Sequence, residues 1–234
     1  MKPHLTILSG WAFPPSIWMA FQKEADPFFS TTVLDSLAAL HQPALLQAPE
    51  DASCWLLGGW SLGGLRVMQS VLENALRPDG LVLLSTTPSF CAREGFSEGT
   101  PGSRVKMLRR SIARQDFERL AAFYAQAALP HRLSEENQQQ WMNATKELEP
   151  DDLTAGLDYL LTTDLRERAR RIQAPSLVMH GTEDAVIPFA AGRILSDILP
   201  CSSFVPVEAS GHDIPFSNSR FLIESIAQFM KPLT

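Results

Sequence analysis

The sequence predicts an α/β fold in which a mostly parallel sheet of about six strands lies between helices. Two observations support this prediction. Short apolar runs rich in Val, Leu and Ile alternate with amphipathic, helix-like stretches along most of the chain. One long stretch, residues 88–174, has helical periodicity but no convincing strand. We therefore expect a core made of residues 1–87 and 175–234, with a helical insertion between the fourth and fifth strands.

The expected strands show little alternation of polar and apolar residues, which is typical of parallel strands buried on both faces. They cover residues 4–9, 31–35, 53–58, 81–85, 176–180 and 203–207. Core helices are expected between and after them, over residues 15–24, 62–76, 189–199 and 218–230. Because crossovers between parallel strands are right-handed, these helices should cover both faces of a single sheet.

The insertion is expected to form helices over residues 105–114, 117–128, 135–148 and 153–161. Ligands of open α/β sheets bind beyond the carboxyl ends of the strands. A helical cap over that edge would cover a site there and supply its walls. The alternative is a separate small helical domain with no site beneath it.

The composition bounds the function classes. The chain of 234 residues is 45% hydrophobic and 20% charged, as in ordinary globular proteins. Its net charge of −6 argues against a nucleic-acid partner. Three cysteines, far apart in the chain, favour a reducing cytoplasm over a disulfide framework or a zinc site. No apolar stretch approaches the length of a membrane span, and we expect a cytoplasmic monomer without a metal or organic cofactor.

The pentapeptide at residues 59–63 reads G-x-S-x-G and lies between a buried strand and an amphipathic helix. In this context the pattern is typical of a nucleophile elbow, a strained turn that exposes a serine hydroxyl above the sheet. The glycines are required because the backbone passes close to its neighbours at such a turn. Ser61 is therefore the candidate nucleophile.

A serine hydroxyl becomes a good nucleophile only when a base accepts its proton and a third group orients that base. In this topology the order along the chain is Ser, acid, His. Asp184 follows the fifth expected strand and His212 follows the sixth, so both should reach the sheet edge that carries Ser61. Two other carboxylates compete. The spacing after the strand favours Asp184 over Glu183, and Asp213 is too close in sequence to His212 to orient its ring.

The tetrahedral intermediate of acyl transfer requires two N–H donors for its oxyanion. One is expected from the backbone of Leu62, directly after the candidate nucleophile. The second is expected from the loop after the first strand, where Gly10 permits a close turn and the amide of Trp11 is the candidate.

The elbow and the order Ser–Asp–His resemble those of the α/β-hydrolase superfamily over the whole chain. More narrowly, the chain is similar to the esterases of biotin synthesis that cleave the methyl ester of pimeloyl-[acyl-carrier protein]. This similarity rests on W-S-L-G-G within residues 57–65, P-x-F-x-A-R within 85–93, and D-L-R at the end of 156–166. There are two departures. Ser9 stands where the family usually has histidine, and the two N-terminal strands common in the superfamily are not expected here.

The resemblance implies a serine carboxylesterase acting on pimeloyl-carrier-protein methyl ester, with the acyl-carrier protein as its partner. A thioesterase, a lyase of menaquinone synthesis and a low-turnover binding protein are the alternatives, because the same residues could serve each of them. The cap would hold the acyl chain. The residues expected to contact substrate are Trp11, Phe123, Tyr124 and Gln126. For the last three, which lie on one expected helix, the alternative is ordinary helix packing.

Residues 104–114 contain five basic side chains and no acidic one. Lys106, Arg110 and Arg114 recur at a spacing of four and should form a stripe on one helix face, whereas the apolar residues fall on another face. We expect this stripe, together with Arg109, to dock an acidic carrier protein, chiefly through association rate and register. The alternative is a solvated helix face without a partner.

Overall fold

The computed structural model describes residues 1–37, 45–74 and 76–233, and its sheet confirms the predicted parallel architecture. Within these residues one six-stranded sheet has the order β2-β1-β3-β4-β5-β6, and every neighbouring pair is parallel. The strands are β1 (Lys2–Leu8), β2 (Ser30–Leu34), β3 (Ala52–Trp60), β4 (Gly80–Leu84), β5 (Ser176–Gly181) and β6 (Ser202–Val207).

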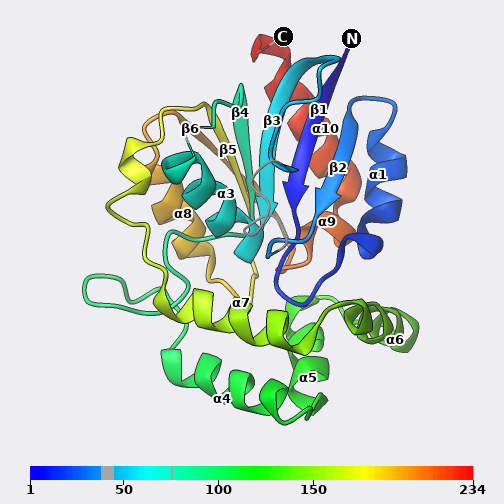
Figure 1. Ribbon diagram of the computed structural model, residues 1–234, viewed down its shortest axis with the longest axis vertical. Helices are drawn as coiled ribbons and strands as arrows, with labels where there is room; N and C mark the ends of the chain where they lie inside the picture. The colour runs from blue at the N-terminus through cyan, green and yellow to red at the C-terminus, as the bar shows by residue number, and fades with distance from the viewer. Residues whose placement is uncertain (38–44, 75, 234) are drawn as a thin grey trace.

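Helices cover both faces of this sheet. Figure 1 shows α3 and α8 on one side and α1 and α10 on the other. The 3-10 turn Pro15–Trp18 leads into α1, and the core helices are α1 (Met19–Ala25), α3 (Leu62–Glu73), α8 (Phe189–Ile198), α9 (Ile214–Ser217) and α10 (Ser219–Met230). Strands β4 and β5 are therefore buried at every residue, while the edge strands β2 and β6 are partly exposed. The expected extension of α3 to residue 76 includes residue 75, which lies outside the described residues.

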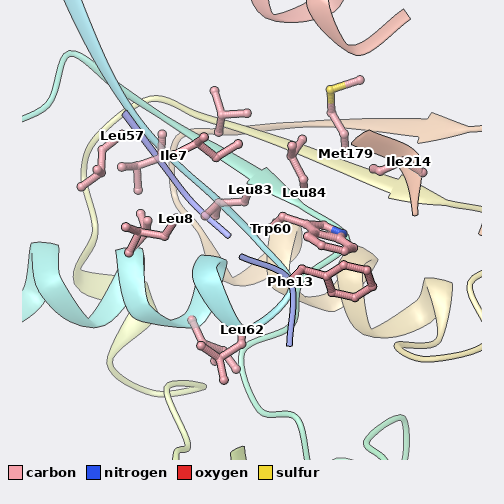
Figure 2. Close-up of a cluster of buried hydrophobic side chains, with 14 of the residues drawn as sticks. Ile7, Leu8, Phe13, Leu57, Trp60, Leu62, Leu83, Leu84, Met179 and Ile214 are labelled. Carbon is pink, nitrogen blue, oxygen red and sulfur yellow. The ribbon is translucent and has the colours of Figure 1, made fainter. Parts of the chain in front are cut away.

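The core extends to the point where β3 meets α3. Figure 2 shows Phe13 and Trp60 side by side there, with Leu62 from the first turn of α3 nearby. The two rings have centroids 4.7 Å apart, and neither side chain is more than 1% exposed. Burying a side chain such as Phe contributes about 1.5–3 kcal/mol. This packing supports the turn that contains Ser61.

Four α-helices lie between β4 and β5 in the part of the chain that the structure describes. They are α4 (Gly102–Ala113), α5 (Glu118–Ala127), α6 (Glu135–Ala144) and α7 (Pro150–Thr162). Figure 1 shows them gathered beyond the carboxyl ends of the strands, at the end of the molecule opposite the two termini. The division of the chain into a core and a cap at residues 88 and 174 stays a prediction. None of the described helices is long and apolar enough to cross a membrane.

Candidate active site

Ser61 lies in a sharp turn between β3 and α3, with φ 56° and ψ −120°. Such backbone angles cost a non-glycine residue about 1–3 kcal/mol, so neighbouring groups must hold them. The Ser61 N–H donates to the Leu84 carbonyl at 2.9 Å, and the Thr86 hydroxyl donates to the Ser61 carbonyl at 2.7 Å. The flanking glycines supply the necessary room, because a Cβ on Gly59 would lie 2.3 Å from the carbonyl carbon of Gly63.

The three predicted triad residues come together from three separate loops. His212 Nε2 lies 2.9 Å from Ser61 Oγ, and His212 Nδ1 lies 2.8 Å from Asp184 Oδ2. His212 is fully buried, and the other two residues are each 7% exposed. In this arrangement Nδ1–H donates to the carboxylate, which leaves Nε2 free to accept the serine proton. The geometry is that required for nucleophilic acyl transfer.

Asp184 is held as an ionised carboxylate. Its Oδ1 accepts the backbone N–H groups of Val186 and Ile187, both at 2.8 Å. Burial alone would raise the pKa of Asp184, but the neighbouring rings of His212 and His180 outweigh burial, so this pKa lies below its usual range. The competing carboxylate at Glu183 is exposed, and no hydrogen bond joins it to the His212 ring in the described part of the chain.

A second buried histidine also contacts Asp184. His180 Nε2 lies 2.9 Å from the Ile187 carbonyl and 3.2 Å from Asp184 Oδ2. Both neighbours are acceptors, so Nε2 must carry the proton. His180 Nδ1 has no partner among the described groups, and a Cβ on Gly192 would lie 2.2 Å from it. This contact was not predicted, because nothing in the local sequence pattern indicates that a histidine at a strand end will reach the acid.

The loop after β1 carries the Trp11 amide, and the Leu62 amide begins α3. The Ser9 hydroxyl donates to the Phe13 carbonyl at 2.5 Å and accepts the Trp18 indole N–H at 2.9 Å. Ser9 therefore supports this loop at the position where the family usually has histidine. The roles of the Trp11 and Leu62 amides as oxyanion donors stay predictions.

A cavity of about 440 Å³ opens above Ser61, between the sheet edge and the helical insertion. Apolar side chains dominate its wall, with few polar groups, as in many small-molecule sites. Its lining includes Trp11, Phe90, Val105, Leu108, Phe123, Gln126, Leu157, Leu160 and Val186. No group of three or more His, Cys, Asp or Glu side chains in the described ranges could hold a metal ion.

The predicted substrate-binding residues separate into two groups. Trp11, Phe123 and Gln126 line the cavity, and the Trp11 and Phe123 rings meet edge to face at 5.2 Å. Tyr124 lies outside the described lining: it is fully buried, and its hydroxyl donates to the Ala12 carbonyl at 2.6 Å. Successive helical residues point about 100° apart, so Phe123 can face the cavity while Tyr124 faces the core.

The predicted docking residues also separate. Lys106, Arg110 and Arg114 are exposed on or directly after α4. Arg109 instead makes a bidentate ion pair with Asp158 of α7. Its Nε and Nη2 lie 2.6 Å and 2.7 Å from the two carboxylate oxygens, so this pair joins two helices of the insertion. Sequence reasoning missed Arg119, which lines the cavity together with Arg104. A single arginine on an amphipathic helix gives no local signal that it will reach a cavity.

A parallel sheet that carries a buried Ser–His–Asp chain at its carboxyl edge defines the class of α/β proteins built for nucleophilic acyl chemistry. Residues 8–224 match the model of the alpha/beta hydrolase family. The chain therefore belongs to the alpha/beta hydrolase family, as the resemblance of its motifs predicted.

Similar proteins are found over nearly the whole chain. A protein of Klebsiella pneumoniae subsp. pneumoniae named pimeloyl-[acyl-carrier protein] methyl ester esterase is 28% identical, across 98% of this chain and 91% of its own length. A protein of Edwardsiella ictaluri with the same name is 29% identical, across 90% of this chain and 86% of its own length. Among solved structures, a bromoperoxidase from Bacillus anthracis aligns with a TM-score of 0.85 at 18% identity, covering 99% of this chain and 92% of its own. An esterase from Exiguobacterium antarcticum aligns with a TM-score of 0.82 at 18% sequence identity. The alignment covers 99% of this chain and 93% of the esterase. These structural likenesses support the fold.

Proposed function

We propose that this protein is a serine carboxylesterase that works through an acyl-enzyme. The observation that carries the proposal is the position of His212, 2.9 Å from Ser61 Oγ and 2.8 Å from Asp184 Oδ2. Ser61 attacks the ester carbonyl while His212 takes its proton, and Asp184 orients the imidazole and stabilises its charged form. His212 then returns the proton to the departing alcohol, and water releases the acid in the second half of the cycle.

The negative oxygen of the tetrahedral intermediate requires donors that are already in place. We assign this task to the amides of Leu62 and Trp11. Leu62 stands at the N-terminus of α3, where the helix dipole adds to the attraction for an anion.

For the substrate we propose the methyl ester of pimeloyl-[acyl-carrier protein]. The names of the most similar relatives support this choice. The apolar cavity above Ser61 suits a methylene chain, whose far end would reach the mouth and the carrier. Arg104 and Arg119 line the cavity, and the exposed stripe of Lys106, Arg110 and Arg114 lies on the same part of the insertion. These cations would attract an acidic carrier protein. A cytoplasmic location and a monomeric state stay predictions.

The decisive assay offers the purified protein this carrier-bound methyl ester and measures both methanol and the mass of the carrier. An esterase releases methanol and leaves the free acid attached to the carrier. Release of the carrier thiol instead would indicate a thioesterase, and no reaction by the folded protein would contradict the proposed substrate. Complementation of a biotin auxotroph that lacks its methyl esterase tests the same assignment in cells.

A further inference from the structure

One helix of the insertion, α5, makes hydrogen bonds with three loops: the loop of His212, the loop of Asp184 and the loop after β1. Its last residue, Ala127, accepts the backbone N–H of His212 at 3.1 Å. The Gln126 amide donates to the carbonyl of Ala185, next to the candidate acid, at 2.5 Å. The third contact is the hydroxyl of Tyr124 on the loop after β1. The helix that lines the cavity thus also contacts two of the triad loops and the loop of the candidate oxyanion donor Trp11.

The third contact falls on a strained residue. Ala12 has φ 64°, in the left-handed region that side chains with a Cβ rarely occupy. Such a conformation persists only when the surrounding groups impose it. The Tyr124 hydroxyl donates to the Ala12 carbonyl at 2.6 Å, and the Thr145 hydroxyl oxygen lies 3.3 Å from the same carbonyl. Ala12 directly follows Trp11, so a change in the Ala12 conformation would move the backbone that carries the Trp11 amide.

The Tyr124 side chain is enclosed by its neighbours. It is fully buried, and its ring packs against Phe13 at 4.9 Å and Trp141 at 5.6 Å between centroids. Burial raises the pKa of the Tyr124 phenol well above its usual range, so the hydroxyl keeps its proton and donates at any working pH. Thr145 completes the arrangement by donating to the Trp141 carbonyl at 2.8 Å.

We infer that Tyr124 is a positioning residue for the oxyanion hole: its hydroxyl holds the Ala12 carbonyl and thereby the loop that presents the Trp11 amide. This inference rests on the proposed acyl-enzyme mechanism. Its consequence is that the insertion contributes to the rate of the chemical step as well as to substrate binding. A hydroxyl that only stabilised the fold would have no such effect on the rate.

The chain offers a matched pair for the test, because its only two tyrosines both reach from the insertion to the core. Tyr159 of α7 donates to the side chain of Gln69 in α3 at 2.6 Å, away from the loop after β1. Tyr124→Phe and Tyr159→Phe each remove one such hydroxyl. We expect Tyr124→Phe to lower kcat on a chromogenic short-chain ester about tenfold with little change in KM, since removal of a whole oxyanion donor costs about 10²–10³ in kcat. Tyr159→Phe should alter the melting temperature without lowering kcat.

A readout that depends on no particular ester separates this inference from the proposed substrate. The rate at which a fluorophosphonate phosphonylates Ser61 also depends on the oxyanion hole, and it should fall in Tyr124→Phe by a factor similar to that in kcat. If that rate falls while the carrier-bound methyl ester is not hydrolysed by the wild type, the substrate is wrong and the inference stands. Equal rates in the two tyrosine variants would overturn the inference, as would a wild-type protein whose Ser61 is not phosphonylated.

Discussion

The sheet edge and the α4 surface of the insertion differ in how firmly their side chains are held. At the sheet edge, Asp184 receives two backbone N–H groups and contacts two histidine rings, all of them buried. On α4, Lys106 and Arg110 project into solvent. Buried, fully partnered groups make a site for one chemistry, whereas exposed charges can act on the approach of many partners. The difference indicates that the reacting groups come from the core, whereas the exposed charges of α4 are suited to act on the approach of a partner.

The largest effect should come from the sheet edge. Replacing Ser61 by Ala removes the nucleophile, and we expect kcat on a chromogenic ester to fall by about 10⁴-fold or more. The exposed Ser203 of β6 offers the matched control, and Ser203→Ala should keep wild-type activity. Equal activity of Ser61→Ala and Ser203→Ala would break the assignment of chemistry to this edge.

A smaller effect is expected one layer deeper, at His180. His180→Leu removes a donor to Asp184 and to the Ile187 carbonyl, and we expect kcat to fall by about 30-fold, with a loss of about 1–3 kcal/mol in the free energy of unfolding. His180→Gln can keep one N–H donor and should retain more activity than His180→Leu. Steady-state kinetics and urea unfolding measure both; identical kcat values in the two variants would show that the hydrogen bond to the acid does not matter.

The α4 surface should respond in selectivity. Reversing the charges of Lys106, Arg110 and Arg114 to Glu should lower kcat/KM for the carrier-bound ester by about tenfold relative to a short-chain ester at low salt. Because exposed charges are screened, the difference should shrink as salt is added. Arg109→Gln is the internal comparison, since Arg109 is bonded to Asp158 and should affect thermal stability more than selectivity. If the ratio of kcat/KM for the carrier-bound ester to that for the short-chain ester does not depend on these charges at any salt concentration, docking at this surface is excluded.

The smallest effect is a pH dependence of stability. The pKa of Asp184 is lower in the folded protein than its unfolded value of about 4, so between these two values the unfolded state binds more protons. The stability that Asp184 contributes is therefore present above about pH 4 and lost as pH falls through the folded pKa. Urea unfolding between pH 3 and pH 7 should show a steeper loss in the wild type than in Asp184→Asn. Parallel curves would mean that Asp184 does not have a lowered pKa.

Local sequence patterns were sufficient to predict the strands and the candidate triad. Each strand of the sheet lies within two residues of its expected position, because apolar runs bounded by turn residues are a local property. The elbow and the two later loops could be found in the same way, since a parallel sheet brings the carboxyl ends of its strands together. The sequence alone therefore predicts Ser61, Asp184 and His212 as neighbours at one sheet edge.

What the sequence could not supply depends on contacts between distant segments. Arg109 and Asp158 are 49 positions apart, and nothing local marks one as the partner of the other. The orientation of Tyr124 likewise depends on how α5 sits on the loop after β1, 112 positions earlier in the chain. Helical periodicity identifies an apolar face, but it does not say whether that face meets the core or an open cavity.

The central claim is that the sheet edge performs acyl transfer through Ser61. Mass spectrometry of protein quenched in acid during turnover of a chromogenic ester tests it most directly. We expect an acyl group on the peptide that contains Ser61 in the wild type and no acylation in Ser61→Ala. Steady turnover with the acyl group on another residue, or turnover that persists in Ser61→Ala, would contradict it.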